Sequence, residues 1–141
     1  MRKPRMSNVL TLAAVAAFGL YLAYSQGWVY FGDTEGIRHL GAKEAAERLS
    51  QPPKPMLVDV RTPEEYRAGH LPDALLLPVD RLRELAPTAL PDRNAPLLVY
   101  CATGNRSNTA VHELKRMGYT NLINMLGGIT AWGRAGYPVV Q

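Results

Sequence analysis

Four short runs of apolar residues indicate the strands of a sheet. They cover residues 56–60, 74–78, 96–100 and 121–125, and none alternates regularly between apolar and polar positions. A strand with one face in water would alternate, whereas a strand covered on both faces reads as a nearly continuous apolar run. The pattern therefore predicts a parallel sheet that other elements cover on both faces.

Helical patterns lie between these runs. Residues 42–49 are rich in Ala and Glu, which favour helix. Thr62 and Glu65 have the spacing of a capping box, in which each side chain bonds the backbone N–H of the other residue. Pro63 suits the first position of a helix, because its missing N–H would have no partner there in any case. Two helices are expected at these places.

Two further helices are expected later in the chain. Asp80 is placed to cap a stretch that carries two leucines on one face, and Ser107 is placed to cap a helix over residues 107–117. Gly118 follows as a stop signal. Strands that alternate with helices predict one α/β domain over residues 33–141, with a parallel central sheet and helices on both of its faces.

An uncharged stretch precedes this domain. Residues 6–32 contain no charged side chain, and residues 9–24 are almost wholly apolar. The hydrocarbon core of a bilayer is about 30 Å thick and needs roughly 20 such residues in a helix. We therefore predict that residues 1–32 are an N-terminal membrane anchor with one transmembrane helix, which contacts the membrane through residues 7–31.

The flanking charges predict the orientation of that anchor. Arg2, Lys3 and Arg5 precede the apolar stretch, and positive charges favour a cytoplasmic N-terminus. The protein is then a single-pass protein of the cell membrane, with its domain on the extracytoplasmic (periplasmic) side. One alternative is a cleaved signal peptide, with Ala23 and Ser25 as small residues near the cleavage site and a secreted or periplasmic product. A domain facing the cytoplasm on an inverted anchor and a buried soluble helix are further alternatives.

Composition argues against several classes of protein. The 16 Lys and Arg residues exceed the 12 Asp and Glu residues by four, and three of the basic residues lie in the first five positions. The rest of the chain is nearly neutral, so it offers no basic stripe for nucleic acid. The single Cys excludes an intrachain disulfide and a cysteine-cluster metal site. His39, His70 and His112 do not have metal-ligand spacing, so neither a metal nor another cofactor is expected.

One loop has the features of a reactive site. Cys101 follows a buried strand directly and precedes a tight turn with Gly104. The backbone N–H groups of a short loop that leads into a helix can bind an anion, and Arg106 adds a positive charge. These groups favour thiolate over thiol, so Cys101 is predicted to be a nucleophile rather than a small core residue.

Other residues have structural and functional interpretations. Asp59 and Arg61 follow a buried strand near this loop, where they could shape the site, but an ion pair or a set of caps is the favoured interpretation. Gly127 and Gly128 could open a helix and let its backbone approach the loop. Trp132 is expected in the core.

Several motifs extend in order over about residues 37–140. They are CATGNR at residues 101–106, LVDVRTPEEY at 57–66, GHLPDA at 69–74, LGGITAW at 126–132 and AGYPV at 135–139. In this order they resemble the rhodanese-like domain family, whose active-site loop is Cys-x-x-Gly-x-Arg. The ordered set is far more specific than any one of its members.

The resemblance implies a sulfurtransferase in which Cys101 becomes a persulfide. Cys101 would take a sulfane sulfur from a donor (thiosulfate or a persulfide) and pass it to a thiol or cyanide acceptor. Donor and acceptor would be small molecules or proteins, and Asp59 and Arg61 would support the site. The residues implied to bind substrate are Ala102, Thr103, Gly104, Asn105, Arg106 and Ser107.

Details of the loop narrow this function. Cys101 and Arg106 are separated by four residues, one fewer than in the related cysteine phosphatases, so the smaller cradle suits one sulfur atom better than a phosphate. Ala102 stands where thiosulfate-processing loops often carry a cationic or polar residue, which puts thiosulfate in doubt as the physiological donor. The alternative function is a non-catalytic binding or adaptor module at the membrane.

Overall fold

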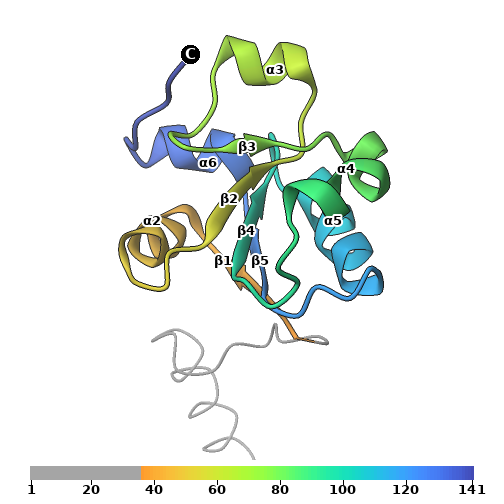
Figure 1. Ribbon diagram of the computed structural model, residues 1–141. Helices are drawn as coiled ribbons and strands as arrows, with labels where there is room; N and C mark the ends of the chain where they lie inside the picture. The colour runs from red at the N-terminus through yellow and green to blue at the C-terminus, as the bar shows by residue number, and fades with distance from the viewer. Residues whose placement is uncertain (1–35) are drawn as a thin grey trace, which may run out of the picture. The chain divides into compact units, whose positions relative to one another are not determined.

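A parallel five-stranded sheet forms the centre of residues 36–141, which are the residues that the computed structural model describes (Figure 1). The strand order is β1-β5-β4-β2-β3. The four predicted strands are confirmed as β2 to β5, whereas β1 was not predicted because its two central residues, Arg38 and His39, are polar. The strands are β1 (Ile37–Leu40), β2 (Met56–Asp59), β3 (Leu75–Leu76), β4 (Leu97–Tyr100) and β5 (Leu122–Met125).

Helices connect the strands and cover both faces of the sheet, as predicted (Figure 1). The capping box of Thr62 and Glu65 is present at the start of α3, with Pro63 in its first turn. The helices are α2 (Ala42–Ser50), α3 (Pro63–Ala68), α4 (Leu82–Ala89), which follows the short 3₁₀ helix η1 (Val79–Arg81), α5 (Asn105–Arg116) and α6 (Gly128–Arg134).

Strand β4 lies inside the sheet and has no exposed residue. Successive residues of a strand point to opposite faces. Leu97 and Val99 therefore pack in the cluster that includes residues of α4 and α5, and Leu98 and Tyr100 pack with residues of α2 and α6. Burying one leucine side chain contributes about 1.5–3 kcal/mol. Packing on both faces thus holds β4 firmly and delivers Cys101 at its carboxyl end.

Two predicted helix caps are wrong. Asp80 lies within η1, and α4 starts after Arg81 without a side-chain cap. Ser107 is the third residue of α5, whose N-cap is Gly104 with a φ of 108°. The left-handed backbone at Gly104 lets the chain turn into the helix earlier than the serine signal suggested. Ser107 is therefore free for a different contact, which lies in the active-site loop.

The predicted membrane anchor, residues 1–32 with its membrane contact at residues 7–31, lies outside the described residues. Within residues 36–141, no helix is both long enough and apolar enough to span a bilayer. The anchor stays a prediction.

Candidate active site

The thiol of Cys101 is buried in a loop between β4 and α5. The residue is 1% exposed. The N–H of Gly104 donates to its Sγ atom at 3.1 Å, and the thiol donates to Oγ of Ser107 at 3.5 Å. The Ser107 hydroxyl in turn donates to the carbonyl of Gly104 at 3.1 Å. Because a hydroxyl can rotate, Ser107 can accept from the neutral thiol and donate to the thiolate.

The surroundings lower the pKa of Cys101. Burial of the thiol is the largest single influence and raises the pKa. The Ser107 side chain and the backbone N–H groups of Ser107, Gly104 and Thr103 stabilise the thiolate, and together they outweigh burial, so that the pKa falls below its ordinary value. The structure therefore favours a reactive sulfur for a physical reason that the sequence had suggested.

Helix α6 holds the carbonyl groups of the loop. The N–H of Ile129 donates to the Cys101 carbonyl at 2.9 Å, and the N–H of Thr130 donates to the Ala102 carbonyl at 3.1 Å. A Cβ atom on Gly128 would lie 2.3 Å from the Cys101 carbonyl oxygen, so only glycine fits there. The expectation that two glycines open a helix and approach the loop is confirmed. Because the carbonyls bond to α6, they do not compete with the N–H groups for the space around sulfur.

Arg106 forms a two-pronged ion pair with Glu65. The two terminal nitrogens of the guanidinium donate to the two carboxylate oxygens at 2.8 Å and 2.7 Å, and both side chains are about one-third exposed. The Arg106 hydrogen bonds are the main reason that the pKa of Glu65 falls to about 2. The sequence had assigned Glu65 only to the capping box. Its second role depends on the placement of β2 beside β4, which brings α3 to the loop.

Asp59 and Arg61 form a buried network beside the loop, not a part of the sulfur's own contacts. Arg61 donates from Nε and a terminal nitrogen to the Asp59 carboxylate, at distances down to 2.7 Å, and also to the carbonyl of Gly69 at 2.6 Å. The hydroxyl of Tyr100 donates to Asp59 at 2.7 Å and accepts from the N–H of Leu71 at 3.1 Å. Burial, aided by Asp59, raises the pKa of Tyr100, so its hydroxyl stays protonated. The network braces the residue that precedes Cys101, and the ion pair that sequence analysis favoured is present.

The remaining loop residues contribute mainly through their backbone. Thr103 is exposed, and its backbone N–H helps to lower the pKa of Cys101. Ala102 is half-buried, and its carbonyl bonds to α6. Asn105 is exposed and is the first residue of α5. The structure thus brings Thr103, Gly104 and Ser107 to the sulfur, whereas Arg106 is occupied by Glu65.

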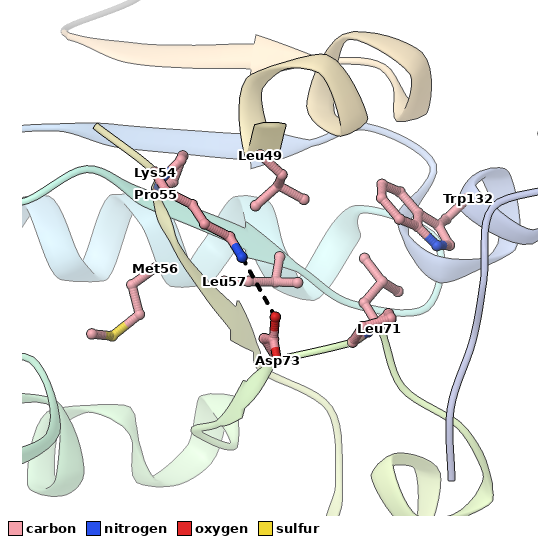
Figure 2. A pocket seen from close by; sticks show the side chains of 9 residues that line it. Leu49, Lys54, Pro55, Met56, Leu57, Leu71, Asp73 and Trp132 are labelled. Carbon is pink, nitrogen blue, oxygen red and sulfur yellow. Dashed lines mark hydrogen bonds and ion pairs between the residues drawn. The ribbon is translucent and has the colours of Figure 1, made fainter. Parts of the chain in front are cut away.

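A separate pocket of about 250 Å³ lies between the end of α2, the start of β2 and α6 (Figure 2). Apolar side chains such as Leu49, Leu71 and Trp132 line much of it. Figure 2 shows the amine of Lys54 pointing toward Asp73 across its opening, at 3.4 Å. None of the predicted site residues lines this pocket.

Comparison with known proteins identifies the family to which this chain is similar. The family model for the rhodanese-like domain matches residues 41–135. A sulfurtransferase of Allochromatium vinosum is 36% identical over 104 residues, which are 74% of this chain and 95% of the relative. The thiosulfate sulfurtransferase PspE of Escherichia coli is 40% identical over 70 residues, 50% of this chain and 67% of the relative.

A solved structure has the same fold. The rhodanese-related protein of Thermoplasma volcanium superposes with a TM-score of 0.64 at 34% identity, over 73% of this chain and 97% of the other. The chain belongs to the rhodanese-like domain family. Its sulfurtransferase relatives support sulfur transfer as the general chemistry of the fold.

Proposed function

We propose that this protein is a sulfurtransferase that carries a sulfane sulfur as a persulfide on Cys101. The observation that carries the proposal is the contact of one buried thiol with the Gly104 N–H at 3.1 Å and the Ser107 hydroxyl at 3.5 Å. The backbone N–H groups of Thr103 and Ser107 also lower the pKa of this thiol. Such a cradle stabilises a negative charge on a single atom. It suits a thiolate before the reaction and the terminal sulfur of a persulfide after it.

The first half-reaction is a displacement at sulfur. The Cys101 thiolate attacks the sulfane sulfur of the donor, a new S–S bond forms, and the donor's S–S bond breaks. The electron pair of the broken bond leaves with sulfite when the donor is thiosulfate, or with a thiolate when the donor is an organic persulfide. Because Cys101 is 1% exposed, the donor must present a small terminal sulfur.

The second half-reaction needs an external acceptor. A thiolate or cyanide attacks the outer sulfur of the persulfide, and the Cys101 thiolate leaves with the electron pair of the S–S bond. The product is an acceptor persulfide or thiocyanate. The chain contains one cysteine, so it cannot resolve its persulfide into an internal disulfide. Small-molecule and protein thiols are both compatible with this step.

Intact-protein mass spectrometry tests the proposal. The wild-type protein treated with a sulfane-sulfur donor is expected to gain about 32 Da, one sulfur atom, and to lose it when thiol or cyanide is added. Cys101→Ser is the matched control and is expected to gain nothing. If the protein gains no sulfur from thiosulfate or from an organic persulfide, the result would contradict the proposed sulfurtransferase activity. It would favour the alternative, an adaptor module at the membrane.

We further propose that residues 7–31 anchor the domain in the cell membrane with the domain outside the cytoplasm. The long uncharged stretch and the three preceding basic residues support this placement. Protease added to spheroplasts, from which the outer membrane has been removed, is expected to degrade the domain. Protection until the spheroplasts are lysed would indicate a cytoplasmic domain, and a shortened soluble product would indicate a cleaved signal peptide.

A further inference from the structure

The positive charge beside Cys101 is largely cancelled within the protein. We call this region, formed by residues 101–106 and Glu65, the mouth of the loop. Arg106 is the one cation among residues 101–106. Both terminal nitrogens of its guanidinium bond to Glu65, the geometry with which arginine would otherwise hold an anionic ligand. Ala102 brings no charge, and neither does Leu126, which is 48% exposed and lies next to Gly127 against the loop.

Glu65 is fixed in this position by its own helix. The N–H of Thr62 donates to Oε2 of Glu65 at 3.0 Å, and the Thr62 hydroxyl accepts from the N–H of Glu65 at 3.2 Å. The carboxylate is therefore not a mobile surface group that happens to approach Arg106. Moving it away from Arg106 would also disturb the start of α3.

We propose that Glu65 determines donor specificity by occupying Arg106, so that the site disfavours dianionic donors relative to organic persulfides. The inference rests on the proposed function and names its donor class. A dianion such as thiosulfate must either compete with Glu65 for the guanidinium or approach with the carboxylate charge still in place. An organic persulfide carries at most one negative charge on its sulfane sulfur and needs less compensation.

Both donors react by the same displacement, so a change in the ratio of their rates when one carboxylate is neutralised reports on charge. With thiosulfate, the Cys101 thiolate takes the sulfane sulfur and sulfite leaves with two negative charges. With an organic persulfide, the thiolate takes the outer sulfur and a thiolate with one negative charge leaves. Glu65 lies outside the bonds that form and break, and acts only through Arg106 and its own field.

The test compares two neighbouring carboxylates of α3. Glu65→Gln releases Arg106 and removes one negative charge from the mouth, whereas Glu64→Gln removes the same charge from a side chain that pairs with Arg67 instead. For each protein, kcat/KM for persulfide formation on Cys101 is measured with thiosulfate and with the persulfide of an uncharged thiol, 2-mercaptoethanol. Glu65→Gln is expected to raise the thiosulfate-to-persulfide ratio roughly fivefold or more, a moderate effect because water screens a partly exposed pair.

The possible results distinguish failure of the inference about Glu65 from failure of the proposed sulfurtransferase function. A Glu65→Gln protein whose ratio rises no more than that of Glu64→Gln overturns the inference, although Cys101 would still form a persulfide. If Glu65→Gln does not fold, Arg106→Gln is expected to lower the ratio, because the Glu65 charge then stands uncompensated, and an unchanged or higher ratio overturns the inference. Loss of persulfide formation from both donors in the wild type would refute the proposed function itself.

Discussion

Gly128 and Cys101 are in direct backbone contact, because a Cβ atom on Gly128 would lie 2.3 Å from the carbonyl oxygen of Cys101. The φ angle of Gly128 is 56°, in the left-handed region. Gly128 is the first residue of helix α6, which donates two N–H groups to the loop. The first turn of α6 and the Cys101 loop are therefore built as one unit, and the geometry around Cys101 depends on both.

The first prediction concerns this contact. Gly128→Ala is expected to destabilise the protein by about 2–4 kcal/mol, through overpacking and a strained φ. It should also slow persulfide formation, because the loop must move away from α6. Thermal unfolding and single-turnover persulfide formation measure the two effects.

Gly133→Ala is the matched control. Gly133 lies in the same helix, and a Cβ atom there would meet nothing within 4 Å. Alanine favours helix over glycine, so this variant should be as stable as the wild type or more stable by up to about 1 kcal/mol. Equal stabilities of the two variants would show that the contact does not constrain residue 128.

The second prediction concerns the role of Ser107 in lowering the pKa of Cys101. Ser107→Ala removes the hydroxyl that contributes most to stabilising the thiolate, so the pKa of Cys101 should rise. The rate of persulfide formation should fall roughly tenfold at neutral pH, since a hydrogen bond to a charged group contributes about 1.5 kcal/mol or more. Its pH profile should shift to higher pH.

The pH dependence of alkylation by iodoacetamide measures the thiolate fraction of Cys101 directly. It therefore separates the change in pKa from any change in donor binding. Asn108→Ala, the exposed next residue of α5, serves as the control and should leave the profile in place. If the pH profile of Ser107→Ala coincides with that of the wild type, Ser107 does not lower the pKa of Cys101.

The third prediction concerns the buried network behind the loop. Tyr100→Phe deletes a hydroxyl that bonds to the Asp59 carboxylate and to the N–H of Leu71. It should cost about 1.5–3 kcal/mol, because one partner is charged and both are buried. Chemical denaturation measures the loss.

Tyr119→Phe is the comparison for that variant. The Tyr119 hydroxyl is buried too, but it donates only to the uncharged carbonyls of Ala86 and Leu90. Its removal should cost about 0.5–1.5 kcal/mol. A Tyr119→Phe protein that is less stable than Tyr100→Phe would contradict the importance of the Asp59 charge.

The fourth prediction concerns acid stability. The pKa of Glu65 is lowered from 4.5 to about 2, first by the Arg106 hydrogen bonds, so the folded state binds fewer protons than the unfolded state in this window. The resulting stabilisation is complete above about pH 4.5 and is lost as the pH falls toward 2. The difference in Tm between wild type and Glu65→Gln should therefore shrink over that range. A constant difference would mean that Glu65 stabilises without its charge.

Most of the fold could be predicted because its strands are buried on both faces. Residues 56–60 and 96–100 are continuous apolar runs and form β2 and β4. The edge strand β1 was missed because it pairs with β5 on one side only and carries Arg38 and His39. The start of α5 was also missed. Serine is a residue type that often caps a helix, but here the backbone of Gly104 makes the turn into the helix.

The candidate site could be predicted only in part. Cys101 and Gly104 are close in sequence, so their spacing indicated a loop of backbone N–H groups around the sulfur, whereas Ser107 was expected as a helix cap and instead contacts the thiol. Glu65 and Arg106 are 41 residues apart, and the pattern around Glu65 showed only its local role in the capping box. No local pattern could connect them, because their distance depends on the order of the strands.

The sequence by itself determined the candidate nucleophile, the loop that surrounds it and the buried strand that delivers it, because these depend on residues within a few positions of one another. Only the tertiary structure decided the net charge at the mouth of the loop and the direction of the loop carbonyls. The first depends on α3, which follows β2, and the second depends on α6, which follows β5. Both neighbours reach Cys101 because their strands flank β4 in one parallel sheet, so that the carboxyl ends of all three meet at the same edge.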